Sequence, residues 1–344
     1  MGLLDFIRVK KIKEDMMSNF QREKEDMMSN FQREKERILF DTFERSMDML
    51  NPTNDHEMQK KILKENLYQI EVEISSFCNR TCWFCPNSKI DRRSNKIELD
   101  EKLFLKIIEN LREINYSNNM CFHRYNETLY DRELILKRLK QARLYLPNAH
   151  LLIATNGDYL NREYLDELVS AGVNDIGLSY YFPNGEEFNI EKAKIECDKM
   201  SKKLGIKYNV KICNDNQYYA DFIYPGITFE YRVINFRNIG FNRAGTIEIL
   251  TDESFIRNTP CYFPFGHIFI DYNGSCMPCC HMRSDVDEHK PYILGDINKN
   301  NLFEIFTNNN YINMRLHLYS NINKKGPCSH CYSPNESIIY NWIK

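Results

Sequence analysis

Three features are missing from this chain, and each absence excludes a class of protein. The 344 residues carry 46 Lys and Arg against 48 Asp and Glu, so a formal net charge of −2 leaves no basic excess for binding nucleic acid. No apolar run approaches the roughly 18 residues that a membrane-spanning helix needs. The chain also does not open with the apolar segment of a secretory signal peptide. We therefore expect neither a nucleic-acid partner nor a membrane span.

Cysteine, by contrast, is plentiful. The chain contains 12 Cys residues, and it carries them without an export signal. Thiols remain reduced in the cytoplasm, where clustered cysteines usually bind metal instead of forming disulfides. The composition therefore predicts a cytoplasmic metal-binding protein.

Three of the cysteines form one short loop. Cys78, Cys82 and Cys85 lie in the run Cys-Asn-Arg-Thr-Cys-Trp-Phe-Cys, which follows a strand-like apolar segment at 67–74. Three thiolates can hold three irons of a [4Fe–4S] cluster and leave the fourth iron open, whereas electron-transfer clusters usually take four cysteines. A structural zinc loop is the alternative, but zinc favours paired Cys-x2–4-Cys knuckles with four ligands.

A Cys-x3-Cys-x-aromatic-Cys loop after a first strand resembles the radical S-adenosylmethionine (SAM) superfamily. The resemblance implies that SAM chelates the open iron through its amino and carboxylate groups. An electron from the cluster then cleaves SAM to methionine and a 5′-deoxyadenosyl radical, which abstracts hydrogen from a substrate. It also implies that Phe84, the aromatic residue of the loop, lies near the adenine and shields the cluster.

The resemblance assigns further positions to SAM at the ends of later strands. The segment Tyr125-Asn126-Glu127-Thr128 resembles the Gly-Gly-Glu-Pro segment that contacts the methionyl amino group. Tyr125 and Asn126 replace its two glycines, so Glu127 carries over best, and a carboxylate there can pair with the ammonium of SAM.

Two more candidates follow the third and fourth predicted strands. Asn156 belongs to a Thr-Asn-Gly tripeptide that resembles one often found after the third strand of the family, although Asn-Gly also favours a simple tight turn. Ser179 ends the fourth predicted strand, where the family often places a polar contact to the SAM ribose.

Residues 67–250 alternate between strand-like and helix-like patterns. Helical periodicity covers 99–115, 131–146, 161–171 and 187–204. Strand candidates cover 67–75, 119–124, 149–155, 174–180, 207–213 and 228–235. This alternation predicts an α/β fold with parallel strands, outer helices and reactive loops at the carboxyl ends of the strands. The resemblance makes the expected architecture an open (β/α)6 partial barrel.

From residue 251 to 344 the pattern changes to short apolar runs, a hairpin signal at 272–274 and clustered cysteines, which predicts a small separate α+β cap. The cap resembles the twitch/SPASM extension of radical SAM proteins, and more closely the twitch type with a single auxiliary [4Fe–4S] cluster. The resemblance makes the auxiliary ligands Cys261, Cys279, Cys328 and Cys331. A zinc ribbon is the alternative, and Cys276 or Cys280 is open as a substitute ligand.

The N-terminal stretch contains a perfect tandem repeat. Eleven residues at 13–23 recur at 24–34, and their apolar members fall on one stripe of a helix over 1–50. This helix either mediates self-association or partner docking, or is a solvated helix lying on the catalytic domain. Residues 51–66 are expected to form a linker.

The expected function is reductive cleavage of SAM followed by abstraction of hydrogen from a small polar substrate of the sugar or aminocyclitol type, for a two-electron oxidation. The alternatives are radical epimerisation or dehydration, modification of a ribosomal peptide, and a non-enzymatic iron–sulfur scaffold. Cys213 closes the fifth predicted strand, so we expect it to point towards the barrel mouth, where its thiol would return hydrogen to a substrate radical. An external electron donor such as flavodoxin or ferredoxin is implied.

Overall fold

The structure is a computed structural model that describes residues 47–320 and 322–333. The repeat helix expected over 1–50 therefore lies outside the described residues, apart from a 3-10 turn, η1, at Met47–Leu50. The described chain from Met49 onward belongs to one compact unit. No helix within the described ranges is long and apolar enough to cross a membrane.

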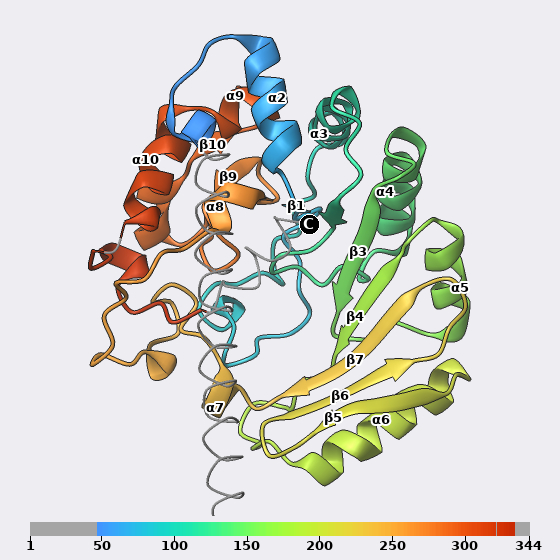
Figure 1. The fold of residues 1–344 in the computed structure, drawn as a ribbon. Helices are drawn as coiled ribbons and strands as arrows, with labels where there is room; N and C mark the ends of the chain where they lie inside the picture. Colours follow the sequence, from blue (N-terminus) through green and yellow to red (C-terminus); the bar gives the residue numbers. More distant parts are fainter. Residues whose placement is uncertain (1–46, 321, 334–344) are drawn as a thin grey trace, which may run out of the picture. The chain divides into compact units, whose positions relative to one another are not determined.

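A single ten-stranded sheet organises this unit (Figure 1). The strands are β1 Gln69–Val72, β2 Asn119–Cys121, β3 His150–Thr155, β4 Asp175–Ser179, β5 Tyr208–Cys213, β6 Gln217–Phe222, β7 Thr228–Ile234, β8 His267–Ile270, β9 Ser275–Met277 and β10 Gly295–Asp296. Their order is β10-β9-β8-β1-β2-β3-β4-β7-β6-β5. The six strands from β8 to β7 are parallel, so their carboxyl ends share one edge of the sheet.

Four helices lie on the outer side of the sheet in Figure 1, and three of them connect consecutive parallel strands while the fourth leads from β4 to β5. They are α3 Glu101–Glu113, α4 Arg132–Tyr145, α5 Arg162–Ser170 and α6 Ile190–Leu204. Each begins after an Asp or Asn whose side chain accepts a backbone N–H of the first turn, as N-cap residues do. The four helices predicted by periodicity are confirmed.

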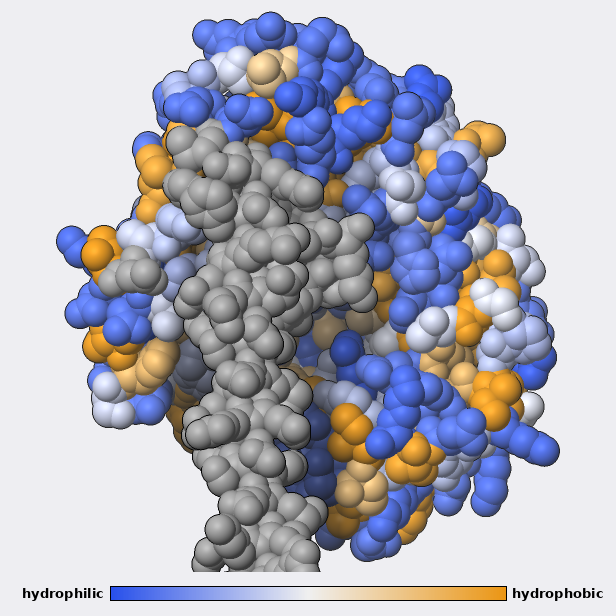
Figure 2. All heavy atoms as spheres, in the orientation of Figure 1, coloured by the Kyte–Doolittle hydropathy of each residue, from blue (hydrophilic) through white to orange (hydrophobic). Residues whose placement is uncertain are grey.

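Hydrophobic residues pack mainly between these helices and the sheet. On the face in Figure 2, hydrophobic residues are scattered among hydrophilic ones. Fully buried side chains instead come from both layers, such as Ile107 and Leu111 of α3 and Ile70 of β1. Burial of this apolar area is the main source of stability for the α/β layers.

The number of parallel strands agrees with the prediction, but their identity does not. β7, not the fifth strand along the chain, pairs with β4. β5 is the outermost strand and pairs only with β6. Sequence analysis did not predict β6 as a strand. The two are joined by the short turn at 214–216, and so few residues permit only an antiparallel hairpin. β8 takes the sixth parallel place, beside β1.

The C-terminal region forms the expected cap, and its strands β8, β9 and β10 continue the same sheet. β8 and β9 form the hairpin that the turn signal at 272–274 predicted, and Gly274 adopts φ +87° there. The remaining elements of the region are α7 Phe236–Ile239, α8 Phe263–Gly266, α9 Leu302–Phe306 and α10 Asn309–Tyr319, with 3-10 turns η2 Pro86–Ser88, η3 Glu248–Leu250, η4 Asp287–Tyr292 and η5 Gly326–Cys328.

The expected linker at 51–66 is also corrected. Residues His56–Asn66 form helix α2, which starts at the N-cap Asp55 and lies against α9. Ile62 and Leu63 are buried, and these two apolar positions give the helix a face that packs onto the domain. Only 51–55 remains a connecting segment.

Candidate active site

The three-cysteine loop follows β1 and opens into a cavity at the carboxyl edge of the sheet. Cys78, Cys82 and Cys85 all line this cavity, and none forms a disulfide. Burial raises the pKa of Cys78 to about 11 and that of Cys82 to about 12. Buried thiols of this kind remain protonated in water at neutral pH, whereas iron displaces the proton when it binds.

Polar contacts from the next strands hold this loop in place. Arg80 forms an ion pair with Asp158, with its Nε 2.8 Å from one carboxylate oxygen, and it also donates to the Tyr181 carbonyl at 3.1 Å. Asn79 donates to Asp158 at 2.7 Å and accepts from Asn156 Nδ2 at 2.8 Å. The predicted site residue Asn156 therefore lines the cavity and also braces the cysteine loop.

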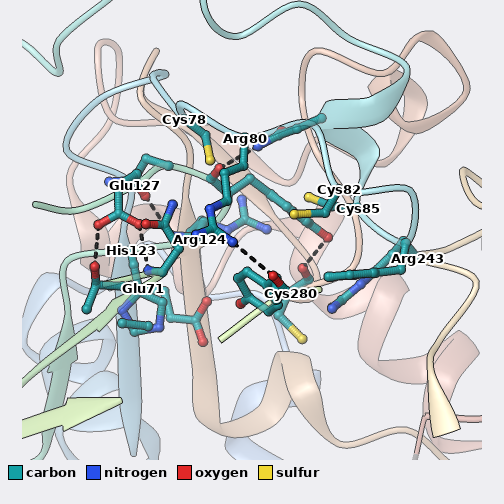
Figure 3. A pocket seen from close by; sticks show the side chains of 18 residues that line it. Glu71, Cys78, Arg80, Cys82, Cys85, His123, Arg124, Glu127, Arg243 and Cys280 are labelled. Carbon is teal, nitrogen blue, oxygen red and sulfur yellow. Dashed lines mark hydrogen bonds between the residues drawn. The ribbon is translucent and has the colours of Figure 1, made fainter. Parts of the chain in front are cut away.

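Glu127 lies in the wall of the same cavity, as the sequence predicted (Figure 3). Its carboxylate accepts the Asn156 backbone N–H at 2.7 Å, the Leu129 N–H at 3.1 Å and the Thr155 hydroxyl. Burial nevertheless raises its pKa to about 7, and these hydrogen bonds only partly oppose that effect. A carboxylate in this position can attract a ligand ammonium group.

Phe84 closes the cavity between the cysteines. Its ring stacks on Phe236 at 3.6 Å between centroids with 7° between planes, and it lies 5.3 Å from the Tyr181 ring. The stack buries the Phe84 side chain, which keeps water from one side of the thiols.

Arg124 joins this site to the C-terminal cysteines. Its guanidinium pairs with Asp271 and donates to the carbonyls of Cys279 at 2.9 Å and Met282 at 2.7 Å. Tyr125, the next residue, donates its hydroxyl to the Cys280 carbonyl at 2.8 Å. Both residues follow β2, so the loop that carries the SAM candidates also fixes the 279–282 segment.

Of the remaining predicted site residues, Tyr125 and Asn126 line the cavity, whereas Ser179 and Cys213 lie elsewhere. Ser179 is buried at the end of β4 and accepts from Arg232 Nε at 2.8 Å, and it does not line the cavity. Cys213 is exposed at the end of the outermost strand β5, so the expectation that it points towards the barrel mouth was wrong.

A second cavity gathers the four C-terminal cysteines. Cys261, Cys279, Cys328 and Cys331 line it together, although they come from three separate segments. Burial, reinforced by electrostatic interactions among these cysteines, raises the pKa of Cys279 to about 12 and also raises that of Cys328. Cys276 is buried on β9 outside both cavities, whereas Cys280 lines the first cavity, not the second. Neither therefore substitutes as an auxiliary ligand in this arrangement.

Sequence analysis missed several polar residues of the first cavity, four of which bear on its chemistry. Glu71, His123, Arg243 and Cys280 line it, and in the view of Figure 3 Glu71 and His123 lie together on the side away from Cys82 and Cys85. Burial raises the pKa of Glu71 to about 7 and lowers that of His123 to about 4, so His123 is neutral near pH 7. Glu71 lies in β1 and His123 follows β2, a strand-end position that sequence reasoning can exploit. Arg243 and Cys280 carry no comparable local signal.

A buried ion-pair network supports the wall between the cavities. Arg92 Nη1 donates to Glu73 at 2.7 Å and its Nη2 lies 2.9 Å from Asp285, while Arg283 donates to Asp285 at 2.6 and 2.7 Å. Glu73 and Arg283 are fully buried, and Arg92 is 3 % exposed. The network ties the strand before the cysteine loop to the segment after Cys280.

We expect Arg92→Met to lower the free energy of unfolding by about 3–5 kcal/mol, because it leaves the Glu73 carboxylate buried without its cation. Urea unfolding of the reconstituted variant measures this loss. Arg93→Met is the matched control, since Arg93 is the exposed neighbour and its replacement should change stability by less than about 0.5 kcal/mol. Equal stability of the two variants would contradict the role assigned to the network.

Both cysteine sets fit iron–sulfur clusters. The first supplies three thiols beside open cavity space, and the second supplies four around a closed pocket, which are the ligand numbers of a site-differentiated and a saturated [4Fe–4S] cluster. Over 47–320 and 322–333, no three His, Cys, Asp or Glu side chains converge on the position of a single metal ion. A cubane distributes its thiolates over different irons, so it requires this wider spacing.

Comparison with known proteins agrees with this geometry. Residues 72–193 match the radical SAM superfamily, and residues 261–332 match SPASM, an iron–sulfur cluster-binding domain. The S-adenosyl-L-methionine-dependent 2-deoxy-scyllo-inosamine dehydrogenase of Niallia circulans is 25% identical over 249 residues, which cover 72% of this chain and 84% of the relative.

Solved structures show the same fold. The crystal structure of BtrN in complex with AdoMet and 2-DOIA superposes with a TM-score of 0.54 at 23% identity, over 78% of this chain and 93% of that one. An open conformation of BtrN gives a TM-score of 0.52 at 22% identity, over 78% and 92%. The chain therefore contains a radical SAM domain and a SPASM-type iron–sulfur region, and it is an oxidoreductase with sites for SAM and for two [4Fe–4S] clusters.

Proposed function

We propose that this enzyme oxidises an alcohol carbon of a small aminocyclitol or sugar by two electrons. The observation that carries the proposal is the first cavity, where the polar side chains of Glu71, His123 and Arg243 share the space beside the three cysteines. Hydroxyl and amino groups of a polyol need such convergent polar partners. The dehydrogenase of Niallia circulans, which acts on 2-deoxy-scyllo-inosamine by its name, supports the same class of substrate.

The chain contributes placement and charge to this reaction. Cys78, Cys82 and Cys85 would hold the cluster whose bound SAM supplies the 5′-deoxyadenosyl radical. Glu127 would accept a hydrogen bond from the SAM amino group, and Phe84 would shield the adenine side of the cavity. Glu71 would accept a hydrogen bond from a substrate hydroxyl or ammonium group. Burial of these partners keeps water away from the substrate radical.

The direct test uses substrates deuterated at single carbons. Incubation of the reduced, reconstituted enzyme with labelled aminocyclitols and sugars should transfer deuterium to 5′-deoxyadenosine for one carbon only. The product should then have a mass two units below that of the unlabelled substrate. If no polyol transfers label while a peptide does, the proposed substrate class is wrong.

Epimerisation is the second candidate, because the Cys280 thiol lines the cavity where a substrate radical would form. An epimerase returns a hydrogen atom, so its product has the substrate mass plus one solvent deuterium in D2O. Cys280→Ala separates the two reactions. An oxidation continues in this variant, whereas an epimerisation stops at the radical stage and loses its product.

The raised pKa of Glu127 predicts a pH dependence for SAM binding. The carboxylate accepts hydrogen bonds from the SAM amino group more strongly than the protonated acid does, and burial holds the pKa of Glu127 near 7 in the free protein. Affinity should therefore rise as pH increases through 7, and be about tenfold weaker at pH 6 than at pH 8 for a single proton. Anaerobic calorimetry measures it. Glu127→Gln should bind weakly with a flat profile, and a wild-type profile that is flat as well would refute the assignment.

We also propose that flavodoxin or ferredoxin supplies the electron in the cytoplasm, and that residues 1–50 mediate self-association. The apolar stripe of the 11-residue repeats supports the second proposal. Deleting 1–46 should lower the molar mass measured by light scattering while 5′-deoxyadenosine production persists. A truncated chain that is inactive and unchanged in oligomeric state would place the repeat in the catalytic machinery instead.

A further inference from the structure

The auxiliary cavity contains a buried guanidinium in addition to its cysteines. Arg257 lines the cavity, is 4 % exposed, and places Nη1 4.0 Å from Cys331 Sγ. The two residues are 74 positions apart in the chain, so the approach is a product of the fold. A cation this close to a cluster ligand acts on the charge of the cluster when the cluster is bound.

Backbone carbonyls hold the guanidinium, and they do not neutralise it. Nη1 donates to the carbonyls of Cys331 at 3.0 Å and Ser333 at 3.1 Å, Nη2 to that of Pro260 at 2.8 Å, and Nε to that of Thr259 at 3.3 Å. Among the described residues no carboxylate forms an ion pair with Arg257. A buried unpaired cation is costly, and the thiolates of the cavity, which are anionic once iron is bound, are anions that lie beside it.

A second buried cation lies on the same side. Lys324 is 2 % exposed, and its Nζ donates to the His317 carbonyl at 3.1 Å and to the Ser320 carbonyl. It interacts electrostatically with the thiols of Cys261 and Cys328. The residues that line this cavity include no Asp or Glu. Two buried cations therefore lie near ligands that become negative when iron binds, and they are neighbours, since the Lys324 backbone N–H donates to the Arg257 carbonyl at 2.7 Å.

We propose that Arg257 and Lys324 raise the reduction potential of the auxiliary cluster and so make it a better electron acceptor. A reduced cluster carries one more negative charge than the oxidised one, and buried cations stabilise the more negative state. The consequence for catalysis rests on the proposed function. In the proposed oxidation, the substrate radical passes one electron to the auxiliary cluster, and the hydroxyl group on the radical carbon loses one proton. The two losses together convert that carbon to a carbonyl.

The test measures the potential of the auxiliary cluster alone. The full-length chain with Cys78, Cys82 and Cys85 replaced by Ala is reconstituted, and its remaining cluster is titrated with dithionite and followed by electron paramagnetic resonance. At the potential where the parent cluster is half reduced, Arg257→Gln should lower the ratio of reduced to oxidised cluster about tenfold, a midpoint shift of about 59 mV to lower potential. Arg257→Lys, which keeps the charge, should shift less.

Lys325→Gln is the matched control, because it removes the same charge from the exposed neighbour of Lys324 and should leave the potential unchanged. Lys324→Gln should lower the potential in the same direction as Arg257→Gln. An unchanged potential in Arg257→Gln with about four irons bound overturns the proposal. If that variant does not hold its irons, an unchanged potential in Lys324→Gln overturns it.

These outcomes are independent of the substrate. No substrate enters the titration, so failure to find a dehydrogenase product would leave the inference intact. Conversely, an unchanged potential rejects the inference even if the enzyme oxidises an aminocyclitol. A purely structural role for Arg257, in which it only ties Thr259 and Pro260 to Cys331 and Ser333, predicts loss of iron in the Lys and Gln variants alike.

Discussion

Replacing Cys78, Cys82 and Cys85 together by Ala should abolish SAM cleavage and lower bound iron from about eight to about four per chain, the content of a single [4Fe–4S] cluster. The three thiols line one cavity, and the auxiliary cysteines line another, so the second cluster should survive. The auxiliary cluster, with four cysteine ligands, offers SAM no open iron. Iron analysis after anaerobic reconstitution and chromatography of 5′-deoxyadenosine measure the two effects.

Cys213→Ala is the control for this variant, since Cys213 is exposed on the edge strand and outside both cavities. It should keep about eight irons and full SAM cleavage. Retained cleavage in the triple variant would overturn the assignment of the site, whatever happens to the auxiliary cluster.

Replacing Cys328 and Cys331 together by Ala should separate SAM cleavage from substrate oxidation. Both thiols belong to the auxiliary cavity, so iron should again fall to about four per chain. The SAM site is built from different residues and should still yield 5′-deoxyadenosine. Without an acceptor for the second electron, the oxidised product should fall below detection.

The measurement compares 5′-deoxyadenosine with oxidised product in the same reaction. Wild-type enzyme should form them in a fixed ratio, whereas the double variant should form the first without the second. Cys276→Ala is a useful control, because Cys276 is buried on β9 close in sequence but outside the cavity. An undiminished product yield in the double variant would mean that the auxiliary cluster is not the acceptor.

Arg124 connects the SAM cavity with the auxiliary cavity. Its contacts to Asp271 and to the carbonyls of Cys279 and Met282 fix the auxiliary loop against the loop that follows β2. These contacts would hold the two cavities in a fixed arrangement for the electron transfer that we propose. The Cys280 thiol lines the first cavity, and its replacement distinguishes the two candidate reactions because only an epimerisation needs it as a hydrogen donor.

Local patterns in the sequence account for the cofactor ligands and for most elements. The spacing of Cys78, Cys82 and Cys85 indicates a three-ligand cluster by itself, because one short loop brings the thiols together whatever surrounds it. Glu127 was found from its position after the second strand. The four main helices follow from apolar periodicity and Asx N-caps, which involve only residues within a few turns of each other.

Tertiary structure alone decided which strands are neighbours and which side chains share a cavity. β7 takes the place beside β4 that we predicted for β5, and β8 is the parallel neighbour of β1. Sequence analysis could not predict these pairings, because strand pairing depends on contacts between residues far apart in the chain. For the same reason Cys213 was misplaced, and Arg243 and Arg257 were not recognised. The approach of Arg257 to Cys331 exists only after the sheet and the C-terminal segment have packed, so its effect on the cluster is a property of the fold.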